Sequence, residues 1–330
     1  MGISASSMDI IGHKEIIAEF VNSWEDDSEY VMAHTSGSTG APKTISLLKS
    51  DMLLSAEATN RFFCVDKSSL LYMPLSIDYI AGKMMVVRAL VADCALQVVT
   101  PSVNPLPEMP YGSISLLPIV PAQTESLLSS PWIGLVENII VGGSPLSTER
   151  EESLLKLPSS CYATYGMTET CSHIALRKLG EDYYKALPGI RFSSDDRCCL
   201  VIESEGFSWH RLVTNDVVEL IDSTTFRWLG RADNIINSGG IKIVPEDIER
   251  RISSLLDGRR FYITSRPSAK WGEELVMVVE GSDFDVEVFQ AAVQSLLPRK
   301  LHPKDVILLP EIPLTSSGKI IRQKIENKSC

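Results

Sequence analysis

The stretch that organises this chain runs from His34 to Lys43 and reads His-Thr-Ser-Gly-Ser-Thr-Gly-Ala-Pro-Lys. Small and hydroxyl residues surround two glycines, so the backbone can approach an anion closely while amide N–H groups, hydroxyls and one lysine face it. The spacing is not that of a Walker loop, and the residues that follow, Thr-Ile-Ser-Leu-Leu, favour a strand rather than a phosphate-capping helix. The composition therefore indicates a phosphate-binding loop of another kind, with a plain surface turn as the alternative.

Short apolar runs of β-forming residues alternate with helix-like stretches around this loop. The runs cover residues 30–33, 70–73, 96–100, 113–117 and 137–141. One helix is expected after Ser50, a good N-cap residue, with an apolar face made of Leu53, Leu54, Ala58 and Phe62. This alternation predicts an α/β fold built on a large, mostly buried mixed sheet.

Two later parts of the chain have different patterns. Residues 186–229 place Gly, Asp and Ser turns between short alternating runs, which predicts a small antiparallel β region. From Gly230 the sequence is polar and punctuated by glycines, and a helix then opens at Pro245, followed by two strand-like runs and a second amphipathic stretch. We therefore expect a core domain over residues 1–230 and a small α+β C-terminal domain over residues 231–330, joined at a flexible boundary.

The composition excludes several classes of protein. Of the 330 residues, 44% are hydrophobic and 22% are charged, which is typical of globular chains and excludes disorder of the whole. The 31 Lys and Arg residues against 42 Asp and Glu residues give a net charge of −11. An acidic chain without a long basic run lacks the electrostatic footprint of nucleic-acid binding, so no nucleic acid is expected as a partner.

Cysteine use and hydropathy indicate a cytoplasmic protein. The seven cysteines form no CxxC pair, and the five histidines show no ligand spacing, so we expect reduced thiols and no zinc site. The most apolar stretch, residues 84–99, is broken by Arg88 and Asp93, and the first residues lack a secretion signal. Neither a transmembrane segment nor export is expected. Gly2 and Ser6 fit a loose acylation pattern, for which a frayed N-terminus is the favoured alternative.

Four motifs, taken together, are similar to those of the adenylate-forming acyl-CoA synthetase family, which also includes the adenylation domains of peptide synthetases. The stretch TSGSTGAPK resembles the family's phosphate-binding signature. Three further matches follow in the family's order: YGMTET at residues 165–170, GRADN at 230–234 running into SGGIK at 238–242, and PLTSSGKI at 313–320. The resemblance covers nearly the whole chain. It implies ATP, Mg²⁺ and coenzyme A as cofactors.

The resemblance implies that a carboxylate attacks the α-phosphorus of ATP, a reaction between two anions that needs metal and cations to neutralise the developing charge. The family's Mg²⁺-binding Glu would be Glu169, its phosphate-contacting neighbour Thr168, and Thr35 and Lys43 would assist, with Thr35 also at the metal. The expected phosphate-loop residues are Thr35, Ser36, Gly37, Ser38, Thr39 and Gly40. A lone loop Glu is otherwise most often a solvated surface residue.

A nucleoside site is implied by further matches. Asp216 resembles the family aspartate that accepts hydrogen bonds from both ribose hydroxyls, and Arg231 resembles the arginine that reaches the same ribose. The family's usual Thr-Gly-Asp is Thr-Asn-Asp in this chain, which leaves the acceptor intact. The loop at Gly142 and Gly143 looks like the one on which the adenine lies, with a strand-terminating turn as the alternative. The predicted nucleotide site also includes Tyr165 and Gly166.

Residues in the last third of the chain are implied in both halves of the family's reaction. Lys319 matches the C-terminal catalytic lysine, whose compact ammonium serves the α-phosphate and the attacking carboxylate in the first half-reaction. Asp233 resembles the hinge about which the small domain rotates. After that rotation the loop with Gly239 and Gly240 would approach the pantetheine thiol of coenzyme A.

The acid substrate is expected to bind in the middle of the chain. The apolar run 81–88 carries Lys83 and Arg88, and a cation in such a run needs an anionic partner, with an internal ion pair or a snorkelling side chain as the alternative. The pattern resembles the ligases that activate o-succinylbenzoate in menaquinone synthesis, in which an arginine follows a glycine in the corresponding segment. Ser172 and His173 would then face the acyl pocket, with a satisfied core histidine as the alternative for His173.

One departure from the family concerns length. Family members carry a large N-terminal portion before the phosphate loop, whereas only 34 residues precede Thr35, so we expect most of one subdomain to be missing. A partner subunit, for example in a homo-oligomer, is one way to supply that surface. The preferred function is an acid–CoA ligase for o-succinylbenzoate. The alternatives are a ligase for another aryl or short acyl acid, with coenzyme A or a carrier protein as acceptor, and a non-catalytic nucleotide-binding protein.

Overall fold

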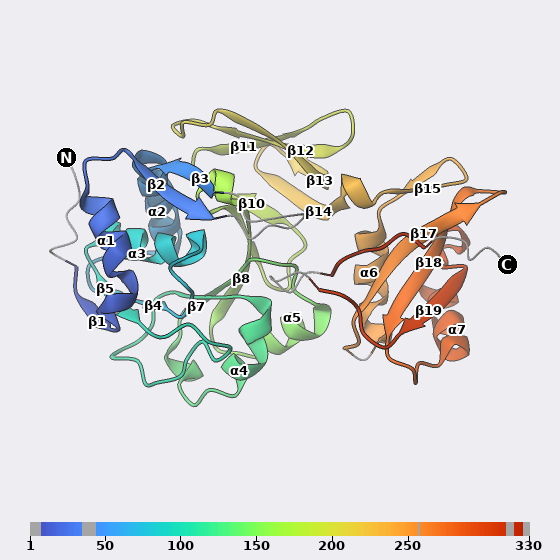
Figure 1. Cartoon of the computed structure of the whole chain (residues 1–330), viewed down its shortest axis with the longest axis horizontal. Coiled ribbons are helices and arrows are strands. Elements are labelled where there is room, and N and C mark those ends of the chain that lie inside the picture. Colours follow the sequence, from blue (N-terminus) through green and yellow to red (C-terminus); the bar gives the residue numbers. More distant parts are fainter. Residues whose placement is uncertain (1–7, 35–43, 257, 315–319, 326–330) are drawn as a thin grey trace.

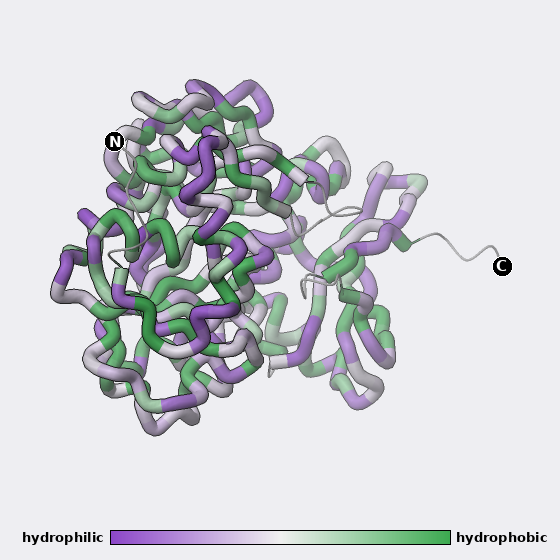
Figure 2. The backbone as a smooth tube through the Cα atoms, turned by 60° about the vertical axis from the view of Figure 1, so that its left-hand side comes forward, coloured by the Kyte–Doolittle hydropathy of each residue, from purple (hydrophilic) through white to green (hydrophobic). Residues whose placement is uncertain are grey.

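The computed structural model of the chain describes residues 8–34, 44–256, 258–314 and 320–325 (Figure 1). Its strands form three sheets and one separate two-stranded ribbon within these ranges. Helices and strands alternate through the first two thirds, which confirms the predicted mixed α/β class. Figure 2 shows that apolar segments run through the interior of the molecule, while polar segments lie along its outer turns.

The first layer is a parallel three-stranded sheet in the order β1-β5-β4, and three helices pack against it. The strands are β1 (Ile10–Gly12), β4 (Leu70–Met73) and β5 (Ala95–Val98), and the helices are α1 (Lys14–Glu25), α2 (Lys49–Phe63) and α3 (Ile80–Ala92). Beside this layer, β2 (Tyr30–His34) and β3 (Thr44–Leu48) form the antiparallel ribbon. The strand predicted directly after Lys43 is therefore confirmed as β3.

The second layer is a nine-stranded mixed sheet in the order β11-β12-β13-β14-β10-β9-β8-β7-β6. Its strands are β6 (Leu117–Ile119), β7 (Asn138–Val141), β8 (Ser160–Gly166), β9 (His173–Lys178), β10 (Tyr184–Ala186), β11 (Ile190–Ser194), β12 (Cys199–Ser204), β13 (Arg211–Asp222) and β14 (Thr225–Arg231). The pairs β6–β7 and β7–β8 are parallel and the others are antiparallel. The predicted antiparallel region 186–229 is confirmed, and it continues this same sheet.

Short helices connect the strands of the second layer. They are α4 (Thr124–Leu128), α5 (Thr148–Leu154) and the single 3₁₀ turns η2 (Pro121–Gln123), η3 (Ile133–Leu135) and η4 (Thr168–Thr170). The apolar run predicted as a strand over 113–117 is only partly one, since Ile114 and Leu116 make isolated bridges and β6 begins at Leu117.

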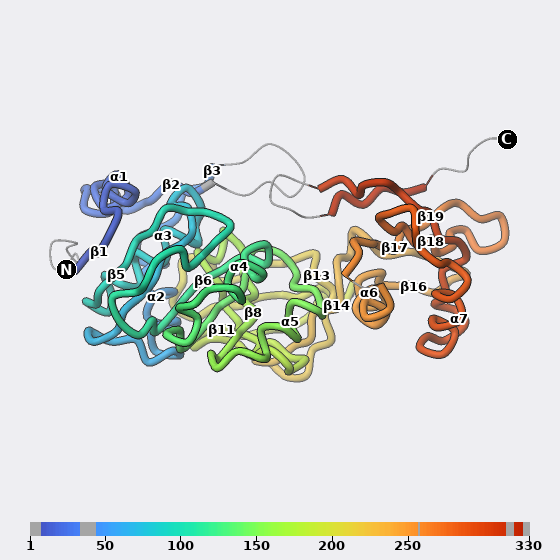
Figure 3. The backbone as a smooth tube through the Cα atoms, turned by 90° about the horizontal axis from the view of Figure 1, so that it is seen from below, coloured from blue at the N-terminus to red at the C-terminus, as the bar shows by residue number. Residues whose placement is uncertain are grey.

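The chain after Gly230 forms a third sheet with a hydrophobic core of its own. Its strands are β15 (Ile236–Ser238), β16 (Ile241–Ile243), β17 (Phe261–Ser268), β18 (Gly272–Glu280) and β19 (Asp305–Leu309), and its helices are α6 (Pro245–Ile252), α7 (Val286–Leu296), η5 (Ala232–Asn234), η6 (Ser253–Leu255) and η7 (Arg299–Leu301). Pro245 opens α6 as predicted. Figure 3 shows this sheet at the end of the molecule opposite α1 and β1. The division into two domains at residue 230 stays a prediction.

Helix α2 differs from its prediction in both its start and its buried face. It begins at Lys49 after Leu48, without a side-chain cap, so Ser50 as the N-cap was wrong. Phe62, from the predicted apolar face, is 44% exposed. The buried residues of α2 are instead Asp51, Met52, Ser55, Ala56, Thr59, Asn60 and Phe63. Polar groups lie inside because they have partners there, as when the backbone N–H and the hydroxyl of Ser208 donate to the carboxylate of Asp51.

Helix α3 contains a glycine whose replacement should destabilise the fold. Alanine normally favours a helix over glycine by about 1 kcal/mol. A Cβ atom at Gly82, however, would clash with the carbonyl oxygen of Ser76 and lie 2.7 Å from its carbonyl carbon. We expect Gly82→Ala to lower the free energy of unfolding by about 2 kcal/mol, measured by urea denaturation. Gly134→Ala is the control, since a Cβ atom at Gly134 meets nothing within 4 Å. Equal stability of the two variants would contradict this packing.

Within the described ranges, none of the helices combines the length and the apolarity needed to cross a bilayer.

Candidate functional site

Two of the predicted site segments lie outside the described residues. They hold the phosphate-loop residues Thr35, Ser36, Gly37, Ser38, Thr39, Gly40 and Lys43, and the C-terminal Lys319. The flanks of both segments are described and paired. His34 lies opposite Thr44 at the open end of the β2–β3 ribbon, and Leu314 forms an antiparallel bridge with Ile320.

The described residues after Lys319 are fixed to the third sheet by a buried ion pair. Both terminal nitrogens of Arg322 donate to the carboxylate of Glu249 on α6, at 2.5 and 2.6 Å. Burial acts to raise the pKa of Glu249, and the hydrogen bonds from Arg322 oppose this shift. Since a buried charge without its partner costs several kcal/mol, this pair fixes the described residues that follow Lys319.

The buried carboxylate of Asp216 contacts two other predicted nucleotide-binding residues, Tyr165 and Arg231. Asp216 lies on β13, is 8% exposed, and is paired in register with Arg231 on β14. The Tyr165 hydroxyl donates to its Oδ2 at 2.7 Å, and Arg231 Nη1 lies 3.5 Å from its Oδ1. The Trp228 indole N–H donates to the same Oδ1 at 3.1 Å. The structure thus brings Tyr165, Asp216 and Arg231 together and adds Trp228, which the sequence analysis missed.

The protonation states of Tyr165 and Arg231 make Asp216 the hydrogen-bond acceptor of this cluster. Burial, reinforced by the charge of Asp216, raises the pKa of Tyr165 well above its usual value, so the phenol keeps its proton and donates it. Burial acts to lower the pKa of Arg231, but its hydrogen bond to Asp233 and the charge of Asp216 outweigh burial and raise it. A carboxylate offers about four acceptor positions, and three donors face this one, so Oδ2 can accept a further hydroxyl.

The other predicted nucleotide residues lie where the parallel strands β7 and β8 end. Gly142 and Gly143 follow β7, and Tyr165 and Gly166 close β8. A Cβ atom at Gly142 would lie 2.5 Å from Thr164 Oγ1, and Gly143 has φ +89°, so both positions favour glycine. Ligands of α/β sheets bind at the carboxyl ends of the strands. These predicted residues therefore lie at the edge of the sheet where α/β folds generally bind ligands.

The YGMTET motif forms a locked turn that carries Thr168 and Glu169 outward. Oγ1 of buried Thr170 accepts the N–H of Met167 at 3.0 Å and lies 2.9 and 2.7 Å from the carbonyl oxygens of Met167 and Ser172, which share its single hydroxyl proton. Thr168 is half-buried and Glu169 is exposed in η4. Sequence analysis missed the role of Thr170.

This turn fits a Mg²⁺ ion bound with a phosphate ligand. In the described part of the chain, no three His, Cys, Asp or Glu side chains gather closely enough to hold a metal. Mg²⁺ commonly binds through one or two carboxylates together with substrate phosphates, and Glu169 offers one such carboxylate on a fixed turn.

Arg88 is a buried cation with a hydrogen bond but without a counter-ion. It lies on α3, is 2% exposed, and its Nη2 donates to Ser172 Oγ at 2.6 Å. In residues 8–34, 44–256, 258–314 and 320–325, no carboxylate forms an ion pair with it. Its Nη1 donates to Met85 Sδ at 3.4 Å, and its Nε has no hydrogen-bond partner. Burial lowers the pKa of Arg88 to about 9, which leaves the guanidinium charged at pH 7. Such a group is costly unless an anion joins it.

His173 belongs to the same cluster of side chains as Arg88, whereas Lys83 contacts a different helix. His173 Nδ1 is 3.4 Å from Ser172 Oγ, and burial together with the charge of Arg88 lowers the pKa of His173 well below its usual value. The structure therefore brings Arg88, Ser172 and His173 together. Lys83 instead places its ammonium 5.0 Å from the ring centre of Phe20 on α1. This contact is a cation–π interaction between helices α3 and α1.

The predicted hinge and the glycine turn have well-defined partners. Asp233 accepts from Arg231 Nη2 at 2.8 Å and from Asn215 Nδ2 at 3.3 Å. Gly239 and Gly240 have φ +58° and +80°, and the N–H of Gly239 donates to the carbonyl of Trp271 at 2.8 Å. A Cβ atom at Gly239 would lie 2.7 Å from the Trp271 ring. Glycine is thus required both by the backbone angle and by this close approach.

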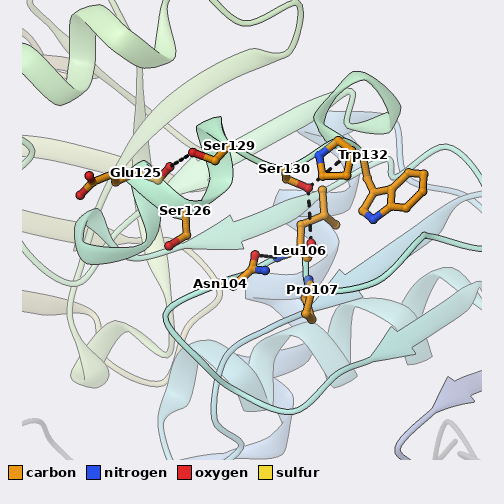
Figure 4. Close-up of a pocket in the computed structure, with 9 residues that line it drawn as sticks. Asn104, Leu106, Pro107, Glu125, Ser126, Ser129, Ser130 and Trp132 are labelled. Carbon is orange, nitrogen blue, oxygen red and sulfur yellow. Dashed lines mark hydrogen bonds between the residues drawn. The ribbon is translucent and has the colours of Figure 1, made fainter.

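A surface hollow of about 490 Å³ lies away from all of these residues (Figure 4). It is lined by Asn104, Leu106, Pro107, Glu125, Ser126, Ser129, Ser130, Pro131 and Trp132. Ser130 Oγ donates to the Leu106 carbonyl at 3.3 Å, and Ser129 Oγ donates to the Glu125 carbonyl at 3.2 Å. Because these hydroxyls bond to the neighbouring backbone, the hollow presents no convergent set of reactive groups.

Comparisons with known proteins give one family and several relatives. The family model for AMP-binding enzymes matches residues 8–201. The 2-succinylbenzoate–CoA ligase of Listeria monocytogenes is 24% identical over 356 residues, covering 99% of this chain and 75% of that protein. An acyl-CoA synthetase (AMP-forming)/AMP-acid ligase II-like protein from Dyadobacter fermentans has a crystal structure with 32% identity and a TM-score of 0.65. This match covers 94% of this chain and 93% of that one.

A further solved structure shows the fold alone. It is the o-succinylbenzoate–CoA synthetase of Bacillus subtilis in complex with its acyl-adenylate intermediate, which is 18% identical to this chain with a TM-score of 0.75. The match covers 96% of this chain and 78% of that one. The mixed α/β arrangement of sheets is therefore shared with enzymes of known structure.

Proposed function

The chain belongs to the family of AMP-binding enzymes, and on that premise we propose that it is an ATP- and Mg²⁺-dependent ligase that joins o-succinylbenzoate to coenzyme A. The predicted family, and with it the class of acid–CoA ligases, is confirmed by the family match and by relatives named as CoA ligases. The acid, the thiol and the residue roles below are the proposal.

The observation that carries the choice of acid is the uncompensated charge of Arg88. An acid with two carboxylates can present one to ATP while the other stays anionic. The second carboxylate would supply the counter-ion that the described residues do not offer to Arg88, and Ser172 already orients the guanidinium. The name of the Listeria relative supports the same acid. An acid with a single carboxylate would leave the cation buried and unpaired.

In the proposed first step, a carboxylate oxygen of the acid forms a bond to the α-phosphorus of ATP, and pyrophosphate leaves. Asp216 and Arg231 hold the ribose, and the turn at Gly142 and Gly143 carries the adenine. Glu169 and Thr35 would hold Mg²⁺, which supplies positive charge that balances the charge of the phosphates. Lys43 and Lys319 add positive charge at the phosphates, where charge develops in the transition state.

In the proposed second step, the thiol of coenzyme A attacks the acyl carbonyl and AMP leaves. Residues 231–330 rotate as a mobile domain about Asp233, which withdraws Lys319 and brings the turn at Gly239 and Gly240 to the thiol. The exchange of contacts would start at Asp233, whose partners are Arg231 at the end of β14 and Asn215 within β13. Because Asn215 and Arg231 adjoin or pair with Asp216, the proposed hinge would lie beside the proposed ribose site.

Pyrophosphate release with a panel of acids tests the proposal. We expect release that requires ATP, Mg²⁺ and o-succinylbenzoate, and formation of the thioester once coenzyme A is added. Release with benzoate or short acyl acids but not with o-succinylbenzoate would contradict the preferred acid. Absence of release with every acid would contradict the ligase itself and leave a nucleotide-binding protein.

Asp216→Asn should weaken ATP binding. The substitution removes the charge that faces Arg231 and turns one acceptor into a donor toward Tyr165 or Trp228. Hydrogen bonds to a charged group contribute about 1.5–3 kcal/mol, so we expect KM for ATP to rise roughly 10- to 100-fold in steady-state assays. Glu219→Gln is the control, because Glu219 is exposed on the same strand. An unchanged KM for ATP in a folded Asp216→Asn variant would remove the ribose role.

A further inference from the structure

A series of hydrogen bonds runs from Arg88 through half-buried Ser172 and buried His173 to helix α2. Arg88 Nη2 donates to Ser172 Oγ at 2.6 Å, and Ser172 Oγ lies 3.4 Å from His173 Nδ1. On the other side of the ring, His173 Nε2 lies 3.1 Å from Thr59 Oγ1. Thr59 is fully buried and His173 is 7% exposed. The predicted acid site is thus connected to a polar residue of α2 that no motif includes.

The direction of this series follows from counting protons. A hydroxyl has a single proton, and that of Thr59 is donated to the backbone carbonyl of Ser55 at 3.0 Å. Thr59 Oγ1 must therefore accept from His173, so the ring proton is on Nε2. Nδ1 then has a lone pair, which accepts the proton of the Ser172 hydroxyl. The lone pairs of Ser172 Oγ remain for Arg88.

The opposite direction leaves the hydroxyl proton of half-buried Ser172 without an acceptor among the described residues. With the proton on Nδ1, His173 would donate to Ser172, which already accepts from Arg88. The Ser172 hydroxyl proton would then have no acceptor among the described residues. A doubly protonated ring would meet the same difficulty and would also face the charge of Arg88. Burial and Arg88 together lower the pKa of His173 well below its usual value, which keeps the ring neutral.

We propose that His173 and Thr59 are positioning residues that act through Ser172 and hold the Arg88 guanidinium with its unpartnered Nε–H directed at the anionic end of the acid. The identity of that anion rests on the proposed function, whereas the order of the hydrogen bonds does not. On this account His173 does not bind the acid itself. Its neutral Nε2–H form turns the Ser172 lone pairs toward Arg88, which fixes one guanidinium geometry at no cost in added charge.

The ring state of His173 can be measured without any ligand. The chain has five histidines, so ¹⁵N-histidine labelling of the full protein gives few signals, and His173→Gln identifies those of His173. Nε2 is told apart from Nδ1 because it couples to both carbon-bound ring protons. We expect a neutral ring with a protonated Nε2 at pH 7. A protonated Nδ1, or a charged ring, would overturn the proposal whatever the protein's substrate is.

The functional part is tested with two substitutions of Thr59. Thr59→Val keeps the shape of the side chain but removes the Oγ1 acceptor, so the buried Nε2–H of His173 loses its hydrogen-bond partner. We expect KM for o-succinylbenzoate to rise about 10-fold, while KM for ATP stays within about twofold. Thr59→Ser keeps the hydroxyl and should retain the wild-type KM for the acid. If Thr59→Val and Thr59→Ser had the same KM for o-succinylbenzoate, the positioning role would be overturned. A rise in KM for ATP equal to that for the acid would overturn it as well.

The hydrogen-bond order around His173 and the identity of the acid can be refuted separately. If the wild type releases no pyrophosphate with o-succinylbenzoate, the proposed acid is wrong, and the tautomer of His173 still decides the hydrogen-bond order. If Thr59→Val does not fold, the comparison of wild type with Thr59→Ser and the tautomer measurement remain. A wild-type ring protonated on Nδ1 would refute the order even in an active ligase.

Discussion

Lys319→Ala is expected to abolish most acyl-adenylate formation while sparing thioester formation from a supplied adenylate. Removal of one group that stabilises developing charge typically costs a factor of about 10²–10³ in rate. The ammonium is needed only while the carboxylate and the α-phosphate, both negative, approach each other. In the second step the acyl group is already activated, and on the proposed rotation Lys319 has left the site.

The two half-reactions are measured separately, by pyrophosphate release without coenzyme A and by thioester formation from synthetic o-succinylbenzoyl-AMP. Lys324→Ala is the matched control, because Lys324 is exposed on the same C-terminal segment and pairs with Glu273 at 3.0 Å. An equal loss in both half-reactions of Lys319→Ala would contradict the moving domain. If Lys324→Ala also lost both half-reactions, the substitutions would have disrupted the folding of the C-terminal segment.

Arg88→Met is expected to raise KM for o-succinylbenzoate by about 100-fold and to leave KM for ATP nearly unchanged. Truncation of one partner of a buried charged pair costs 2–5 kcal/mol, and about 100-fold lies within that range. Methionine fills much of the space that the arginine stem occupies. Because Arg88 has no counter-ion among the described residues, we also expect the free variant to be at least as stable as the wild type.

Lys83→Met is the control for Arg88→Met. Its ammonium lies over Phe20, so its loss should change KM for the acid by less than about threefold. Steady-state kinetics give both constants, and urea denaturation gives the stabilities. If Arg88→Met left KM for the acid unchanged and destabilised the free protein, Arg88 would return to a structural role.

Contiguous motifs and strong element patterns could be predicted from the sequence. The phosphate loop, YGMTET and the C-terminal PLTSSGKI are each read from neighbouring residues, and they led to the family that the comparisons confirm. The strand after Lys43 and the helix that opens at Pro245 were predicted for the same reason, since β-forming runs and a proline at the first helical position are local signals.

Residues that matter through distant partners could not be predicted. Trp228 donates to Asp216 across β13 and β14, and Thr59 meets His173 although 114 positions separate them. The buried face of α2 was wrong for the same reason. A rule that buries apolar residues selects Leu53 and Phe62, whereas the polar side chains of α2 are buried because other elements supply their partners.

The central claim is that this chain activates an acid by joining it to AMP, and mass spectrometry of the reaction without a thiol tests it most directly. The protein is incubated with ATP, Mg²⁺ and o-succinylbenzoate, and the bound small molecules are released and weighed. The account predicts a species with the mass of o-succinylbenzoyl-AMP that disappears when coenzyme A is added. Recovery of unreacted ATP and free acid alone, from a protein shown to be folded, would contradict it.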